Sequence, residues 1–165
     1  MNNTQPNSIT HVLQSYREPD QPIALLNALE QAVRVEIGHI FMTCFAVDAK
    51  QMLATRIYTS LADNNNYPTG GAKDMCEHPW GECVIHRHET FIANTAQEIE
   101  RVFPDAQAIF DLGCAACLSV PTLWRGEVIG AINICHREHW FSAEHIKTGE
   151  QLAPLLLPAL LSRAE

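Results

Sequence analysis

Residues 39–48, HIFMTCFAVD, limit the fold more than any other stretch, because both faces of this predicted strand are apolar. Side chains alternate between the two faces of a strand. Phe41 and Phe45 therefore share one face, while Met42 and Cys44 share the other. A strand of this kind lies in the middle of a sheet and is covered on both sides. The chain is therefore predicted to fold as a sheet between two covering layers.

Two pairs of apolar segments are predicted to form hairpins. Residues 51–60, QMLATRIYTS, follow the first strand after a short turn. Residues 114–137, CAACLSVPTLWRGEVIGAINICHR, contain two apolar strands around a tight turn at Arg125-Gly126. A further short strand is predicted within ETFIAN, residues 89–94.

Helices are predicted at both ends of the domain. Apolar residues recur at helical spacing within residues 20–38. The second helix covers residues 141–163, with Ser142 as its N-cap and with Pro154 and Pro158 expected to kink or split it. The segments between the hairpins are predicted as a long loop at 61–79, a short helix from Trp80 and two helical segments within 96–113.

This order of elements predicts an α+β fold. Consecutive hairpins favour a central antiparallel sheet of five to six strands. The apolar terminal helices are expected on one face, and the middle loops and helices on the other, where a pocket can form. Residues 1–19 are predicted to be a tail that can contain a short helix, and residues 20–165 a single domain.

The composition limits the partners and the compartment. The net charge of -8 argues against a nucleic-acid backbone or an anionic membrane as the partner, because both require clustered Lys and Arg. The N-terminus lacks the pattern of a signal peptide, and the most apolar tract, residues 152–161, is too short to span a bilayer. We therefore expect a cytoplasmic protein whose six cysteines are free thiols.

The segment CEHPWGECVIHRH, residues 76–88, is dense in metal-ligand types. On the predicted loop and helix these side chains do not share a face, and the spacing of Cys76 and Cys83 is not that of a zinc pair. Cys83 is expected beside Trp80, facing inward at the rim of the pocket. We predict no metal site and no cofactor. Histidines that could ligate a tetrapyrrole occur at 39, 78, 86 and 136, and none stands out.

The remaining cysteines are interpreted from strand parity. Cys114 and Cys117 form the one C-x-x-C pair, but opposite parity in a strand would place them on opposite faces. Cys114 would have to sit in the preceding turn to reach Cys117. We therefore expect one thiol at the edge of the pocket and one in the core. Cys44 and Cys135 lie within apolar strands and are predicted to be core residues.

Polar residues in covered positions predict the ligand site. Arg56 and Tyr58 share one parity of the second strand, and a buried Arg needs an anionic partner, either on a ligand or on Asp105 or Glu82. Asn133 lies in an otherwise apolar strand and needs a hydrogen-bond partner. The predicted ligand is small, anionic and partly aromatic. The predicted ligand-binding residues are Arg56, Tyr58, Tyr67, Lys73, Trp80, Cys83, Asp105, Cys117 and Asn133.

Over roughly residues 20–162 the chain resembles a GAF domain, a fold related to PAS domains. The resemblance rests on the first hairpin, the YPTGGAK loop, WGECVIHRHETFIAN, VFPD and, most specifically, LGCAACLSVPTLWRGEVIGAINI. It implies a sensor that binds small molecules such as cyclic nucleotides, tetrapyrroles or metabolites. GAF domains usually regulate an attached domain, and we expect this one to stand alone, with a protein partner or a homodimer formed through the terminal helices.

The resemblance also implies one enzymatic alternative. The free methionine-(R)-sulfoxide reductase family uses cysteines around the pocket, and Cys83 and Cys114 stand near two of the family's positions, with Cys76 as the remaining partner. The family's acidic and serine-rich stretch is replaced here by AACLSVP, and an acidic residue that holds the substrate is replaced near Cys117. We therefore expect a non-catalytic sensory protein, with this reductase as the alternative.

Overall fold

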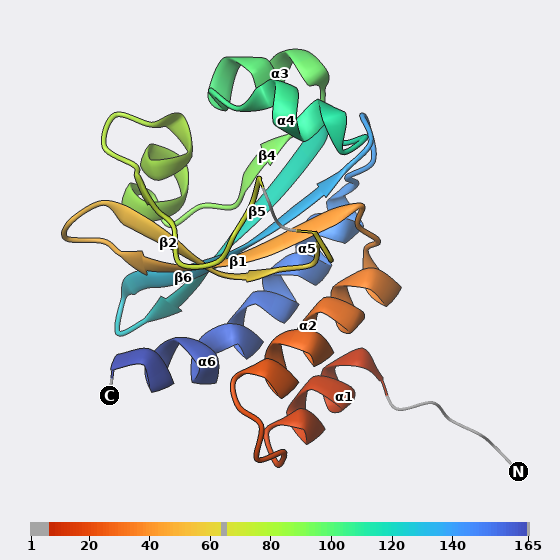
Figure 1. The fold of residues 1–165 in the computed structure, drawn as a ribbon, viewed down its shortest axis with the longest axis vertical. Coiled ribbons are helices and arrows are strands. Elements are labelled where there is room, and N and C mark those ends of the chain that lie inside the picture. The colour runs from red at the N-terminus through yellow and green to blue at the C-terminus, as the bar shows by residue number, and fades with distance from the viewer. Residues whose placement is uncertain (1–6, 64–65, 165) are drawn as a thin grey trace, which may run out of the picture.

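A six-stranded antiparallel sheet forms the centre of the molecule (Figure 1), with the strand order β3-β2-β1-β6-β5-β4. The computed structural model describes residues 7–63 and 66–164. The strands are β1 (Phe41–Asp48), β2 (Leu53–Thr59), β3 (Ala72–Asp74), β4 (Phe91–Ala93), β5 (Ala116–Trp124) and β6 (Glu127–His136). Both predicted hairpins are present, and β1 also pairs with β6 at the centre.

The turn between β5 and β6 explains the register of the second hairpin. Arg125 and Gly126 both have positive φ angles, 53° and 80°. Two positive φ values are the requirement of the tight hairpin turn whose twist matches that of the flanking strands. Trp124 and Glu127 are directly paired at its base.

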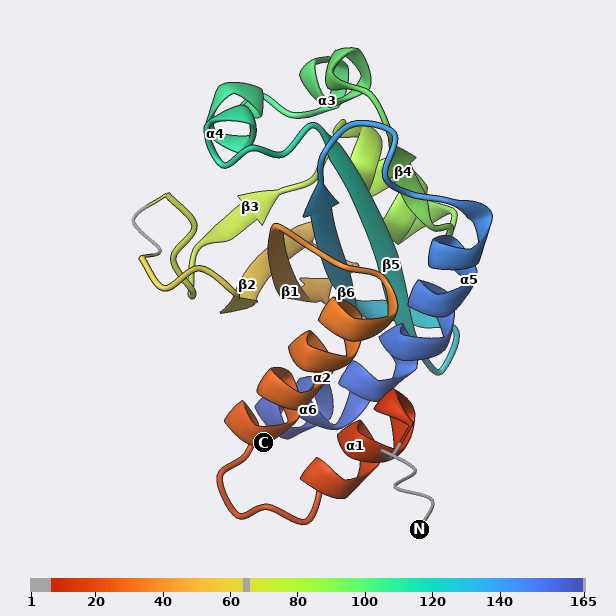
Figure 2. The same cartoon turned by 90° about the vertical axis from the view of Figure 1, so that its right-hand side faces the viewer.

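The terminal helices cover one face of the sheet (Figure 2). They are α1 (Ser8–Ser15), α2 (Ile23–Glu36), α5 (Ala143–Leu152) and α6 (Leu157–Leu161), with 3-10 turns at Ala153–Leu156 and Ser162–Ala164. Ser142 caps α5 as predicted, and the helix is split before Pro154. α1 lies within the predicted tail, and its Val12 is fully buried in the layer.

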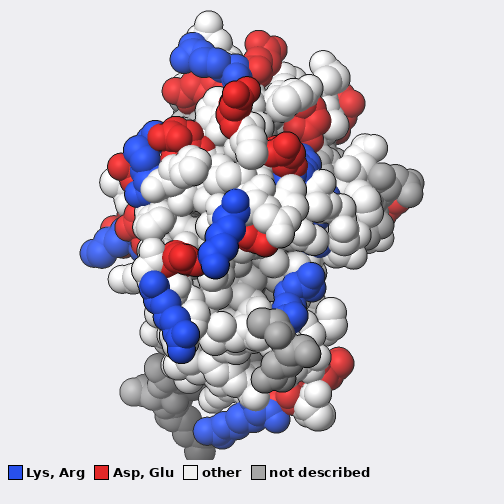
Figure 3. All heavy atoms as spheres, turned by 90° about the vertical axis from the view of Figure 1, so that its left-hand side faces the viewer, with Lys and Arg blue, Asp and Glu red and all other residues white. Residues whose placement is uncertain are grey.

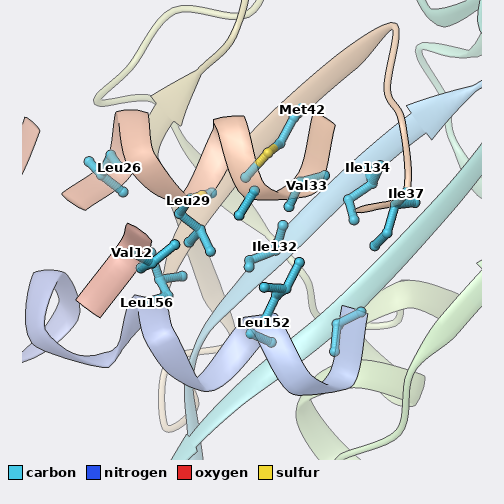
Figure 4. Close-up of a cluster of buried hydrophobic side chains, with 14 of the residues drawn as sticks. Val12, Leu26, Leu29, Val33, Ile37, Met42, Ile132, Ile134, Leu152 and Leu156 are labelled. Carbon is cyan, nitrogen blue, oxygen red and sulfur yellow. The ribbon is translucent and has the colours of Figure 1, made fainter. Parts of the chain in front are cut away.

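The core beneath these helices is aliphatic and closed. Figure 4 shows Leu29, Val33, Leu152 and Leu156 of the helices facing Ile132 of the sheet. Each of these side chains is 1% exposed or less. We call this layer the helical face of the sheet.

The second layer consists of short segments that cover the opposite face, which we call the cavity face. They are the π-helical turn η1 (Gly81–His86), α3 (Ala96–Val102) and α4 (Ala106–Asp111). The predicted loop at 61–79 contains β3, an edge strand whose Ala-Lys-Asp sequence carries no strand signal. The predicted helix after Trp80 is present, but its Arg87 N–H donates to Glu82 O, the i→i+5 bond of a π-helix.

Charged side chains of both signs are interspersed on the face in Figure 3, and its described residues form no continuous basic surface there. Within residues 7–63 and 66–164, no helix combines the length and the hydropathy needed to cross a bilayer.

Candidate ligand-binding site

A cavity of about 460 Å³ lies between the cavity face of the sheet and the segments that cover it. Its volume falls within the usual range for small-molecule sites, about 300–1,000 Å³. An adjoining cavity of about 40 Å³ shares Phe45, Arg56, Lys73, Phe103, Asp105 and Asn133 with it. The main cavity is further lined by Ala54, Asn66, Asp74, Met75, His78, Trp80 and Pro104, and the adjoining one by Phe41, Thr43, Tyr67, Ile109, Cys117 and Cys135.

Arg56 is the buried cation of this site. It lies on β2 and is 5% exposed, with its guanidinium carbon 5.3 Å from the ring centre of Phe45 and 5.1 Å from that of Tyr67. Its Nη1 donates to the Pro68 carbonyl at 3.0 Å, whereas its Nε has no hydrogen-bond partner among the described residues. Burial lowers the pKa of Arg56. The positive charge is thus enclosed by aromatic rings, and it forms no ion pair with any described residue.

Three further buried polar atoms at the cavity also lack a hydrogen-bond partner among the described residues. Tyr67 Oη, Trp80 Nε1 and Asn133 Oδ1 are buried and have no hydrogen-bond partner within residues 7–63 and 66–164. A buried polar group left unpaired costs about 1–3 kcal/mol. Together with Arg56 Nε they supply both donors and acceptors for a bound molecule.

An ion pair joins the edge of the sheet to its cover beside the cavity. Lys73 Nζ of β3 lies 3.5 Å from Asp105 Oδ2, in the turn before α4, and both side chains remain partly exposed. Asp105 thus pairs with Lys73, although Arg56 was the partner considered from the sequence. Arg56 and Lys73 carry positive charges in the lining, and Asp74 and Asp105 carry negative ones, so the formal charges of the cavity balance.

His78 belongs to the site but was not selected from the sequence. Its Nδ1 accepts a hydrogen bond from the Trp80 N–H at 3.1 Å, which leaves the ring proton on Nε2. Burial, followed by the charge of Lys73, lowers the pKa of His78, so the ring is neutral at pH 7. The sequence signal that could have identified His78 is the tripeptide His78-Pro79-Trp80, because a His two residues before a buried Trp can accept a hydrogen bond from the Trp N–H.

The prediction that Tyr58 shares a face with Arg56 is wrong. Phe45 pairs with Arg56 and Cys44 with Tyr58, so Ile57 is an extra residue at a β-bulge. A one-residue shift moves the following side chains to the other face. Tyr58 therefore packs on the helical face, where its hydroxyl lies 3.4 Å from Asn27 Oδ1 of α2.

Cys83 lies outside the cavity lining, although Trp80 lines it. The sequence argument used α-helical angles, whereas η1 is a π-turn that changes which residues share a side. Cys83 Sγ is buried at 3.8 Å from the Glu89 carbonyl, and burial raises its pKa. Cys76 is exposed in the preceding loop.

The other predicted residues meet at the cavity. Arg56, Tyr67, Lys73, Trp80, Asp105, Cys117 and Asn133 all line one or both of its parts. Cys114 precedes β5 and packs in the same core as Cys117, so the two thiols do not point to opposite faces. Among the described residues, no group of three or more His, Cys, Asp or Glu side chains could hold a metal ion.

Comparisons with known proteins agree with this architecture. The family model of the GAF domain matches residues 20–160. No curated protein shows a significant sequence match to the chain.

Solved structures show the same fold at low sequence identity. The GAF domain of a phosphoenolpyruvate-protein phosphotransferase from Acinetobacter is 16% identical, with a TM-score of 0.74 over 99% of this chain and 96% of that one. The GAF domain of a two-component sensor histidine kinase from Bacillus halodurans is 10% identical, with a TM-score of 0.72 over 87% and 96%. The chromophore-binding domain of an unusual bacteriophytochrome from R. palustris is 12% identical, with a TM-score of 0.69 over 96% of this chain and 61% of that one.

Proposed function

Because the chain belongs to the GAF domain family, a family of small-molecule-binding sensory domains, we propose that it senses a small anionic molecule held in the cavity described above. One observation carries this proposal. The guanidinium of Arg56 is buried at the cavity without an acidic partner among the described residues. A carboxylate or phosphate on the ligand would pair with the guanidinium and would accept hydrogen bonds from the unpaired donors of Arg56, Tyr67 and Trp80.

The remaining lining supports a ligand with a planar, unsaturated part. Phe45, Trp80 and Phe103 supply aromatic surface. Asn133 Oδ1 can accept a hydrogen bond, so the ligand is expected to carry an N–H or O–H group besides its anionic group. Because Lys73 already pairs with Asp105, Arg56 is the cation that a ligand would meet, and this favours a single negative charge on the ligand.

A thermal-shift panel tests this function. Small carboxylates, nucleoside monophosphates and inorganic phosphate are compared with neutral amides. At a concentration near 100 times its Kd, a ligand stabilises a protein by about 2.7 kcal/mol, which for this chain length corresponds to a rise in Tm of about 5–10 °C. We expect that rise with an anionic compound, and not with neutral ones.

Arg56→Met tests whether the buried guanidinium binds the anion. It keeps the length and apolar contacts of the side chain but removes the charge, so the anion-dependent rise in Tm should disappear. Arg101→Met is the matched control, because Arg101 is exposed on α3 outside the cavity lining. Cooperative melting of both variants verifies folding. Equal anion binding by Arg56→Met, or no response to any anion, would contradict the proposal.

The reductase chemistry has less support. Burial raises the pKa of Cys83, and raises that of Cys114 to about 12, while the hydrogen bond with Asp74 raises that of Cys76. The thiolate is the nucleophile in such reactions, so these shifts disfavour attack. We expect no turnover of free methionine sulfoxide with a thiol reductant. Turnover that is lost in Cys83→Ser or Cys114→Ser would favour the enzyme instead.

Action in the cytoplasm, without an attached effector domain and through a protein partner or a homodimer, stays a prediction. Sedimentation of the purified chain with and without an anion that passes the thermal-shift panel would test dimerisation. A monomer in both states would leave a protein partner as the expected route of output.

A further inference from the structure

The cavity face carries a pair of thiols to which the proposed pairing of Arg56 with an anion assigns no role. Cys117 of β5 and Cys135 of β6 are direct cross-strand partners in the antiparallel ladder. Both side chains line the adjoining cavity, and they are 2% and 5% exposed. Cys44 lies on the helical face and Cys76 in an exposed loop, so neither is near this pair.

We propose that Cys117 and Cys135 form a reversible disulfide when the protein meets a peroxide, and that the cavity floor is therefore a redox-sensitive site. Directly opposed residues of an antiparallel pair have Cα atoms about 4.5–5.5 Å apart. Disulfides span Cα separations of about 4.4–6.8 Å, so the Cα spacing of the paired strands lies within the range that a disulfide bridges.

The surroundings of Cys117 make it the attacking thiol. Its Sγ lies 3.6 Å from Ser119 Oγ. A hydrogen bond from Cys135, followed by that from Ser119, lowers the pKa of Cys117 in spite of burial, whereas the same contact and burial raise the pKa of Cys135. A thiol with a lowered pKa contains more of the reactive thiolate. A small oxidant can reach it through the cavity, since about 40 Å³ accommodates a molecule of this size.

The reaction balances with hydrogen peroxide as the oxidant. Cys117 sulfur attacks one peroxide oxygen, the O–O bond breaks, and the thiol proton leaves with hydroxide as water. Cys135 sulfur then displaces hydroxide from the Cys117 sulfenic acid, and its proton converts that hydroxide to a second water. Two thiols are oxidised by two electrons in total, and one peroxide is reduced to two waters.

The bond is expected to be easily reduced. Opposed Cβ atoms in a ladder lie about 4.5–5.5 Å apart, whereas a relaxed disulfide has them about 3.5–4.5 Å apart. Strained disulfides have higher reduction potentials and are typically the labile, regulatory ones. The bond would also draw β5 and β6 together beside Asn133, two residues before Cys135. That consequence for the ligand rests on the proposed function, while formation of the bond does not.

Peptide mapping of the whole chain after peroxide treatment tests the inference. Trypsin cleavage at Arg101, Arg125 and Arg137 places Cys117 in peptide 102–125 and Cys135 in peptide 126–137. We expect the two peptides to be crosslinked, the intact mass to fall by two hydrogens, and free thiols to fall from six to four. Dithiothreitol should restore all six.

Variants identify the thiols involved. Peptide 102–125 also contains Cys114, so the Cys114→Ala variant is needed to show which of its two thiols reacts. We expect this variant to keep the crosslink, and we expect the same of Cys76→Ser, a surface control. Cys117→Ala and Cys135→Ala should lose it. Thermal melting of each reduced variant verifies folding. A crosslink lost in Cys114→Ala, a bond that involves Cys76, oxygen addition without crosslinking, or six thiols unchanged by peroxide would each overturn the inference.

Anion binding by the reduced protein separates this test from that of the ligand. If the reduced chain binds an anion through Arg56 but forms no crosslink, the redox inference fails while the proposed function stands. If the crosslink forms and no anion binds, the proposed function fails and the disulfide stands.

Discussion

The two faces of the sheet are both buried, yet they are built from different chemistry. The helical face packs aliphatic side chains, and its buried Thr122 hydroxyl donates to the Ala153 carbonyl at 2.7 Å. The cavity face combines aromatic rings with thiols and a guanidinium. Of five buried polar side-chain atoms without a partner among the described residues, four lie at the cavity. The helical face is therefore expected to contribute more to stability, whereas the cavity face keeps polar atoms without hydrogen-bond partners among the described residues.

The largest test of this difference removes a side chain from the helical face. Leu156 is fully buried, and Leu156→Ala should destabilise the protein by about 2–5 kcal/mol, the cost of lost burial plus a cavity. Phe45→Leu, on the cavity face beside existing empty space, should cost less. Denaturant unfolding measures both. If Phe45→Leu proved the costlier change, the division of roles between the faces would be wrong.

A pair of matched polar replacements should have opposite signs. Thr122→Val removes the hydrogen bond to the Ala153 carbonyl, so a loss of about 0.5–1.5 kcal/mol is expected. Asn133→Val removes a carbonyl oxygen that has no partner among the described residues, so the ligand-free protein should gain about 1 kcal/mol. Urea unfolding of both variants without added ligand provides the comparison. Losses in both would indicate that Asn133 is satisfied in solution.

Acid should weaken both faces through two histidines with lowered pKa values. Burial lowers the pKa of His39, in the loop after α2, and of half-buried His78, at the cavity, below the ordinary value of 6.5. A histidine with a lowered folded pKa binds fewer protons than it does in the unfolded chain, so its stabilisation is complete above 6.5 and is lost as the pH falls toward the folded value. The urea midpoint should fall from pH 7 to pH 5, and His78→Gln should flatten that fall. A midpoint that rises on acidification would contradict these shifts.

The smallest effect is expected at the ion pair beside the cavity. Lys73 and Asp105 are partly exposed, and such pairs contribute about 0–1 kcal/mol. Lys73→Met should therefore change the free energy of unfolding by less than about 1 kcal/mol. Thermal melting at low and high salt measures it. A clearly larger loss would mean that the pair holds the cover of the cavity face in place.

The sequence predicted the sheet, both hairpins and the helical layer, because apolar periodicity and turn residues are local signals. It could not predict the bulge at Ile57, which depends on how β1 and β2 pair, and this bulge is why Tyr58 was misplaced. It also missed β3, whose pairing comes from its position beside β2 and not from its residues.

The site was predicted where a polar side chain interrupts an apolar pattern, as at Arg56 and Asn133. The prediction failed where backbone geometry decides the direction of a side chain. Cys83 was expected at the rim because an α-helix was assumed, and the π-turn moves it away. The pairing of Cys117 with Cys135 required the register of β5 on β6, which no pattern in the sequence specifies.

The pairing of β1 with β6 has a consequence for synthesis on the ribosome. β1 is made early, but its central partner belongs to the second hairpin and emerges much later. Until then β1 has an open edge and two apolar faces without their full cover, the kind of segment that aggregates from partly made chains. The nascent protein is therefore expected to need a chaperone, or slow dilute refolding in vitro, until β6 closes the sheet.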